Sequence, residues 1–296
     1  MKKSVFIKGF AALILLSTTL FTSCKSDRDD EDDVYSSMDE FYTKHRQEEQ
    51  EFIIDSAGKG PIIGKQKTQL YLDTSIFMLP GGGDLTFPFT VKLIELYPQS
   101  DFMEYPMSTV AGGQVTESAG AIRVRVFKNG TEAVLRPGKF YATVMPDTNN
   151  LLSNMNVYYG SNKDSDVDWT IASDASVVST QSSFYALSLY QMGWVNCAKL
   201  HSSSAATTQI TLTSKGKGPI DVYVVAKDYF SVVRVSNLTS IAVPVGEKVT
   251  IIGMAMDQNK KYRLHNTSTT VTAGMTVALD LKIVTEQDVL DALAAL

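Results

Sequence analysis

The chain has 296 residues, of which 44% are hydrophobic and 20% charged, and its formal net charge at pH 7 is -5. This acidic balance, with no stripe of clustered Lys or Arg, argues against a nucleic-acid partner. Only two cysteines are present, Cys24 and Cys197, which is too few for the disulfide framework of a small secreted domain.

The first 23 residues have the layout of a secretory signal peptide. Lys2 and Lys3 give a positive start, residues 10–20 are a mainly apolar run, and small residues precede Cys24. So short a run falls below the roughly 20 apolar residues that a membrane-spanning helix needs. We therefore expect residues 1–23 to be removed on export.

Cys24 stands at the expected cleavage point, and its surroundings resemble a bacterial lipobox. In that motif the cysteine is acylated, commonly with palmitate, and becomes the mature N-terminus. The resemblance implies a firm lipid anchor, since each buried methylene contributes about 0.8 kcal/mol. Phe21 departs from the Leu, Val or Ile usual at its place. The alternative is a free thiol in an ordinary exported protein.

An acidic block follows the cysteine: Asp27, Asp29, Asp30, Glu31, Asp32 and Asp33. Its charges repel, so residues 24–51 are expected to form an extended tether that ends in a short amphipathic helix around Phe41 and Tyr42, with His45 facing solvent. The block resembles the acid-rich export signal of Bacteroidetes-type surface lipoproteins. That resemblance implies transfer to the outer face of the outer membrane, and the alternative is a plain acidic linker.

From about residue 52 the apolar and polar side chains alternate, which predicts short β-strands. The clearest are 90–93, 121–127, 131–135 and 140–144. Asn129 and Gly130 suit the two positive-φ positions of a type I′ turn, so the second and third of these strands should form a hairpin. In the second strand, Ile122, Val124 and Val126 are expected to face a core. Arg123 and Arg125 are expected to face water.

A second β-rich stretch runs from about residue 183 to 284, with strands expected near 210–212, 222–226, 232–235, 249–253 and 275–283. Thr285 then begins a short helix, with Asp288 at the capping-box position. The mature length suits two domains of roughly 100–130 residues. We predict an all-β fold of two tandem antiparallel β-sandwich domains, at residues 52–178 and 179–296, with the helix at the C-terminus.

Five stretches occur in an order that resembles one protein group: 89–97, 119–124, 135–139, 193–197 and 243–248. The group consists of uncharacterised Bacteroidetes-type surface lipoproteins, and the similarity covers residues 60–296. It implies a ZU5-like β-sandwich followed by an immunoglobulin-like module. After Asn196 and Cys197 the group has Asp-Arg-Phe, whereas this chain has Ala-Lys-Leu. The group has no established activity, so the resemblance implies a fold rather than a function.

Side chains suited to catalysis are few. The three histidines, His45, His201 and His265, lie in no recognised nucleophile or metalloprotease motif. Cys197 follows Trp194 and Val195, which indicates a buried apolar thiol rather than a nucleophile. We therefore predict that the protein is not an enzyme.

Asp164, Asp166 and Asp168 alternate along the chain as the ligands of a calcium loop do. They lack the glycine and the bidentate glutamate that an EF-hand loop requires. Calcium is thus a weak candidate here and a solvated loop is the alternative. No cofactor and no established metal site are predicted.

Tyr158 and Tyr159, close to this acidic loop, are the aromatic residues best placed for ligand contact at the surface, while Trp169 and Trp194 are expected in the core. We expect a lipid-anchored outer-membrane protein that is exposed at the cell surface and binds or assembles with another surface protein. The alternatives are a glycan-binding accessory lipoprotein of a nutrient-uptake system and, third, a hydrolase of unrecognised type that uses the acidic loop.

Overall fold

β-Strands make up 48% of the chain and helices 10%, which confirms the predicted all-β class. The computed structural model describes residues 34–58, 60–146, 151–161 and 167–296. The signal peptide, Cys24 and the acidic residues 27–33 lie outside the described residues, as do Asp164 and Asp166. All the described residues belong to one compact unit.

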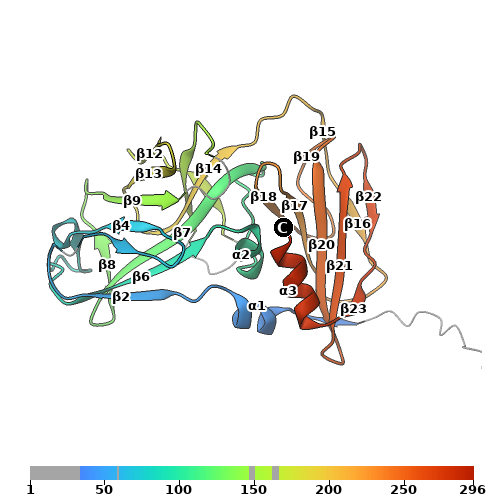
Figure 1. The fold of residues 1–296 in the computed structure, drawn as a ribbon, viewed down its shortest axis with the longest axis horizontal. Coiled ribbons are helices and arrows are strands. Elements are labelled where there is room, and N and C mark those ends of the chain that lie inside the picture. The colour runs from blue at the N-terminus through green and yellow to red at the C-terminus, as the bar shows by residue number, and fades with distance from the viewer. Residues whose placement is uncertain (1–33, 59, 147–150, 162–166) are drawn as a thin grey trace, which may run out of the picture. The chain divides into compact units, whose positions relative to one another are not determined.

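Two sheets form a first sandwich (Figure 1). An eight-stranded sheet holds β2 (Gln50–Ile54), β5 (Phe77–Met78), β6 (Phe89–Leu96), β7 (Thr116–Lys128), β8 (Thr131–Leu135), β10 (Asn156–Gly160), β11 (Trp169–Ile171) and β14 (Gly193–Leu200). A five-stranded sheet holds β3 (Ile62–Ile63), β4 (Gln69–Tyr71), β9 (Tyr141–Pro146), β12 (Val177–Thr180) and β13 (Phe184–Leu189). A 3-10 turn, η1 (Thr74–Ile76), lies between β4 and β5 along the chain. Their shared core includes Leu70, Leu93, Tyr141 and Cys197.

The expected hairpin is confirmed. β7 and β8 pair from Lys128 opposite Thr131, and the turn residues Asn129 and Gly130 have φ angles of 49° and 81°. Ile122, Val124 and Val126 are fully buried, as predicted. The expectation that Arg123 and Arg125 face water is wrong in part: Arg125 donates to Glu49 at 2.6 Å, and Arg123 lies over the Trp194 ring.

A six-stranded sheet forms the other half of the fold. It holds β1 (Tyr35–Ser36), β17 (Asp221–Ala226), β18 (Ser231–Val235), β20 (Lys248–Asp257), β21 (Tyr262–Thr270) and β23 (Lys282–Val284). One face packs on two small strand pairs, β15 (Thr207–Thr208) with β19 (Val243–Pro244), and β16 (Thr211–Thr213) with β22 (Thr276–Ala278). The β16–β22 pair is parallel, whereas the other pairs of described strands are antiparallel.

The strand expected at 275–283 is two strands, β22 and β23, in different sheets. The chain crosses between them, and it buries Leu279 and Leu281 on the way. The helix that follows, α3 (Glu286–Ala294), begins as predicted: the Thr285 hydroxyl accepts from the Asp288 backbone N–H, and the Asp288 carboxylate accepts from the Thr285 backbone N–H.

The division of the chain between the sheets differs from the expected boundary at residue 178. β13 pairs with β9, and β14 pairs with β7 from Gly193 opposite Val124 to Leu200 opposite Thr116. Both strands therefore complete the first sandwich, and the other half begins after residue 200. Period-two alternation shows that residues 184–200 are strands, but it does not show which strands they pair with.

A continuous hydrophobic core joins the two halves. It contains Trp194 of β14, Phe102 and Met103 of α2 (Gln99–Glu104), and Tyr223 of the six-stranded sheet. Side-chain hydrogen bonds cross the same junction: Gln99 Nε2 donates to the carbonyl oxygens of Ala226 and Ser231, at 2.9 and 3.1 Å. The two halves are thus packed together through a shared core.

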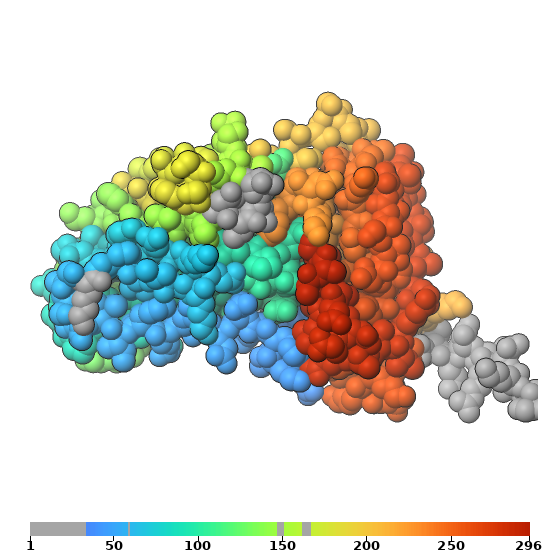
Figure 2. Space-filling view, viewed as in Figure 1, coloured from blue at the N-terminus to red at the C-terminus, as the bar shows by residue number. Residues whose placement is uncertain are grey.

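The N-terminal segment also links both halves. β1 pairs with β20, α1 (Asp39–His45) packs beside α3, and β2 then joins the eight-stranded sheet. In Figure 2 the blue atoms of α1 lie against the dark red atoms of α3. His45 does not face solvent as expected, because its Nε2 lies 2.6 Å from the Glu286 Oε1 of α3. The segment is therefore part of the fold, not a lead into one domain.

Candidate functional site

The predicted ligand-contact pair, Tyr158 and Tyr159, is buried rather than exposed, at 3% and 9% of full side-chain exposure. Neighbouring residues of a strand point to opposite faces, so the two rings cannot act together. The Tyr159 hydroxyl accepts from the backbone N–H of Tyr190 at 3.0 Å and lies 2.6 Å from the Ser176 hydroxyl, which indicates a structural role. Burial raises the pKa of Tyr159.

Tyr158 lines a hollow of about 700 Å³ between the two halves, which we call the junction pocket. The pocket is lined by a loop, by the β10–β11 hairpin and by three more distant residues: Ser108, Val110, Ala111, Gly112, Gly113, Gln114, Tyr158, Val167, Asp168, Trp169, Thr170, Ile171, Leu200, Arg234 and Ile241. Its lining contains both apolar and polar side chains. Such a lining suits a small ligand with both apolar and hydrogen-bonding groups.

Hydrogen bonds hold two large side chains of the junction pocket in place. Trp169 Nε1 donates to the Ser108 carbonyl oxygen at 2.7 Å, and Arg234 Nη2 donates to Asp221 Oδ1 at 3.0 Å. Trp169 is buried in the core, as predicted, and only 3% exposed. Both side chains are thus held by hydrogen bonds, and little aromatic surface of the pocket is open for stacking on a ligand.

The acidic loop contributes one described residue, Asp168, whose side chain is exposed at the rim of the junction pocket. Its backbone N–H donates to the Ser161 hydroxyl at 3.3 Å. Across the residues that the structure describes, no three His, Cys, Asp or Glu side chains are gathered as metal ligands.

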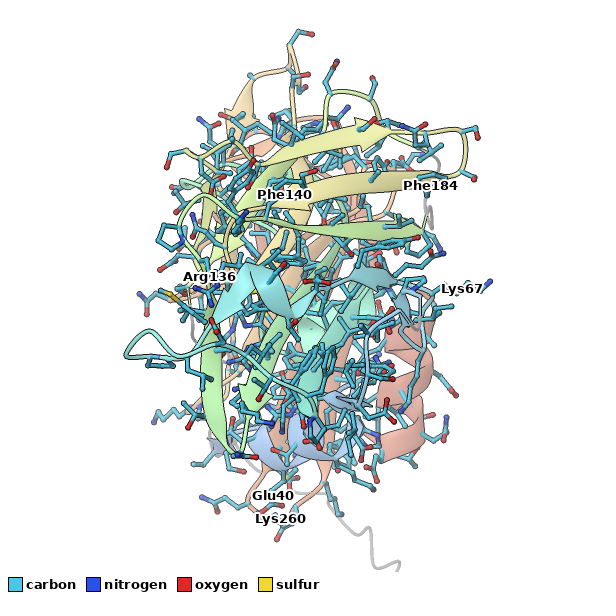
Figure 3. The ribbon with its side chains drawn as sticks, turned by 90° about the vertical axis from the view of Figure 1, so that its left-hand side faces the viewer. Glu40, Lys67, Arg136, Phe140, Phe184 and Lys260 are labelled. Carbon is cyan, nitrogen blue, oxygen red and sulfur yellow. The ribbon has the colours of Figure 1, made fainter. Side chains whose placement is uncertain are left out.

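A larger hollow, of about 960 Å³, opens between the two sheets of the first sandwich, and we call it the edge groove. Its lining is mainly apolar: Phe52, Ile53, Ile54, Pro61, Ile62, Ile63, Leu70, Tyr71, Leu72, Ile76, Phe87, Phe89, Phe140 and Ala142. Figure 3 faces this end of the molecule and labels Phe140. Sequence reasoning missed the groove, although the apolar stretches 52–54 and 61–63 were visible.

Four large apolar side chains of the edge groove are exposed: Ile53 at 75%, Ile63 at 59%, Tyr71 at 46% and Phe140 at 45%. Single exposed apolar residues are common on proteins, but four of them in the lining of one hollow are typical of a binding surface. The edge groove is thus the strongest candidate for a functional site among the described residues.

The histidines have structural partners. His201 Nδ1 lies 2.9 Å from Glu117 Oε1, and its ring stacks on Tyr229 with the centroids 4.0 Å apart. His265 Nδ1 accepts from the Asp280 backbone N–H at 3.0 Å, and burial lowers the pKa of His265.

Cys197 is a buried, free cysteine, as its sequence context indicates. Burial raises the pKa of its thiol, and this keeps the thiol in its protonated, unreactive form.

Two carboxylates with raised pKa lie on α2 and line neither hollow. Burial and the charge of Asp101 raise the pKa of Glu104 to about 7, and burial raises that of Asp101 itself. The nearby Glu95 accepts the backbone N–H groups of Gln66 and Thr68, each at 2.9 Å. Glu95 thereby stabilises the turn at residues 66–68, which indicates a structural role for this carboxylate.

Within the described part of the chain, no helix combines the length and the apolar character needed to cross a bilayer. No known family model matches the chain, and no curated protein is similar to it at a significant level.

Proposed function

We propose that the protein is a lipid-anchored binding module at the surface of the outer membrane, which holds a partner protein and catalyses no reaction. The observation that carries this proposal is the edge groove, a hollow of about 960 Å³ with a mainly apolar lining and four exposed large apolar side chains. Apolar surface of this kind is costly to leave in water, so it is typical of a site that a partner covers.

The anchor rests on the sequence around Cys24. From Cys24 to the start of β1 at Tyr35 the chain spans at most about 40 Å when fully extended. A module on so short a tether stays close to the membrane, where a partner in the same membrane is at high local concentration.

A second candidate function is glycan binding, and the junction pocket favours it. Trp169 and Tyr158 lie beside the polar side chains of Gln114, Asp168 and Arg234, a combination that suits the apolar face and hydroxyl groups of a sugar. The low exposure of both aromatic rings makes this the weaker proposal.

Affinity purification of the full-length lipoprotein from its own envelope, in mild detergent, tests the main proposal. We expect a stoichiometric outer-membrane or surface protein to co-elute. A lipoprotein that elutes alone, but binds members of a glycan array, would replace the main proposal with the second one.

A further inference from the structure

Both walls of the edge groove end in a strand with an open edge. β2 is the last strand at one edge of the eight-stranded sheet. Among the described strands it pairs only with β6, from Gln50 opposite Leu93 to Ile54 opposite Phe89. β3 is likewise the last strand at one edge of the five-stranded sheet, and it pairs with β4. In an edge strand, alternate backbone N–H and C=O groups point away from the sheet and are available to another strand.

The side chains around these edges suit the same kind of occupant. Phe52 and Ile54 alternate with Glu51 and Ile53 along β2. Phe52 and Ile54 are half-buried and pack against the core of the first sandwich. The core is therefore partly open between the sheets. An added strand would place every second side chain in this opening, over a pairing length of about 17 Å for five residues.

The described lining of the groove carries acidic side chains and no basic ones. Glu51 and Asp73 are the charged residues of the described lining, and Asp55 directly follows β2. The Ser75 hydroxyl and backbone N–H lower the pKa of Asp73, which stays ionised. Glu51 is partly neutralised by its ion pair with Lys92. An anionic lipid such as a fatty acid would meet repulsion here, whereas a basic segment would be attracted.

The same charges disfavour a second copy of this chain as the occupant. If two β2 strands paired antiparallel about Ile53, Glu51 of one copy would lie opposite Asp55 of the other. Like charges directly opposite each other destabilise a strand pair. The groove thus favours a different protein, with basic residues next to an apolar stretch.

We infer that the edge groove binds an extended segment of the partner protein, which adds a strand to β2, inserts alternate apolar side chains between the two sheets and places Lys or Arg near Asp73. This inference rests on the proposed function and specifies its partner. Backbone pairing supplies affinity and the apolar pockets supply selectivity, as in other cases of strand addition.

A synthetic peptide tests the inference. The probe is a fluorescent ten-residue peptide that alternates Ile with Thr and ends in two Lys, and its anisotropy is measured with the full-length protein. We expect Ile63→Glu to weaken binding about tenfold or more. Asp73→Asn, whose amide oxygen can still accept from Ser75, should weaken binding less and reduce its salt dependence. Ile283→Glu is the matched control, since Ile283 is 54% exposed but lies on β23, outside the groove.

Three results would overturn the inference. These are no binding at millimolar peptide, equal binding by Ile63→Glu, and equal binding of a peptide with Pro at alternate positions, which lacks the N–H donors of a strand. Competition by a fatty acid but not by an unlabelled peptide would assign the groove to lipid instead. If the envelope partner still co-elutes with Ile63→Glu, the proposed function stands while the groove assignment fails. If nothing co-elutes with the wild type, the proposed function itself fails.

Discussion

The backbone oxygen of Tyr35 lies so close to Gly218 that a Cβ on Gly218 would clash with it. Tyr35 also donates its N–H to the Lys217 carbonyl oxygen at 2.7 Å. This contact helps to hold β1 where it pairs with the end of β20. Position 218 requires glycine for two reasons, the close approach of the Tyr35 backbone and a φ angle of 110°. The glycine-rich stretch 216–218 is thus part of how the N-terminal segment is fastened to the fold.

Gly218→Ala should lower the free energy of unfolding by about 2 kcal/mol or more, because it adds a clash with backbone to an unfavourable φ. Gly246→Ala is the matched control, since Gly246 has a φ angle of 94° but no atom within 4 Å of its Cβ position. Urea unfolding measures both. Equal losses in the two variants would show that the Tyr35 contact does not constrain position 218.

Trp194→Ala should lower the free energy of unfolding by about 3–5 kcal/mol, since it empties a fully buried site in the core that joins the two halves. Trp194 also packs edge-on against Tyr105, with the centroids 5.7 Å apart. Because both halves share this core, tryptophan fluorescence and far-UV circular dichroism of the wild-type protein should report one coincident unfolding transition. Two separate transitions would contradict a single packed body.

The stability of the protein should depend on pH through Glu104. Its pKa is about 7 in the folded protein and near the usual 4.5 when unfolded, so the folded state binds more protons between these values. Its contribution is fully present below about pH 4.5 and is lost as the pH rises through 7. His265, whose pKa is lowered, acts in the opposite direction, so the wild type must be compared with Glu104→Gln. An unchanged pH profile in this variant would contradict the assignment.

Cys24→Ser should release the mature protein from the membrane fraction, because the serine cannot carry the acyl chains that anchor it. Cys197→Ala, at the buried free cysteine, is the control and should remain with the membrane. Immunoblots of fractionated cells measure both. Persistent membrane association of Cys24→Ser would overturn the lipid anchor.

Local features of this fold were predictable from the sequence. The hairpin at Asn129 and Gly130 needs only two residues that tolerate positive φ, and the start of α3 needs only Thr285 and Asp288 at the right spacing. The burial of Trp169 and Trp194 was expected because aromatic residues at alternate strand positions usually belong to a core, and that of Cys197 because Trp194 and Val195 precede it.

Features that depend on distant partners were not predictable in this way. Alternation along residues 193–200 is the same whether β14 pairs with β7 or joins the other half. The groove beside β2 depends on the position of β2 as the last strand of its sheet. The opposite faces of Tyr158 and Tyr159 follow from strand period, but the burial of both depends on the sheets that cover them.

Binding at the edge groove is tested most directly by quantitative recovery of the envelope partner with three forms of the full-length lipoprotein: wild type, Ile63→Glu and Ile283→Glu. We expect stoichiometric recovery with the wild type and with Ile283→Glu, and strong loss with Ile63→Glu, whose new charge lies in the apolar edge groove. Equal recovery by all three forms would contradict a binding function located in the edge groove.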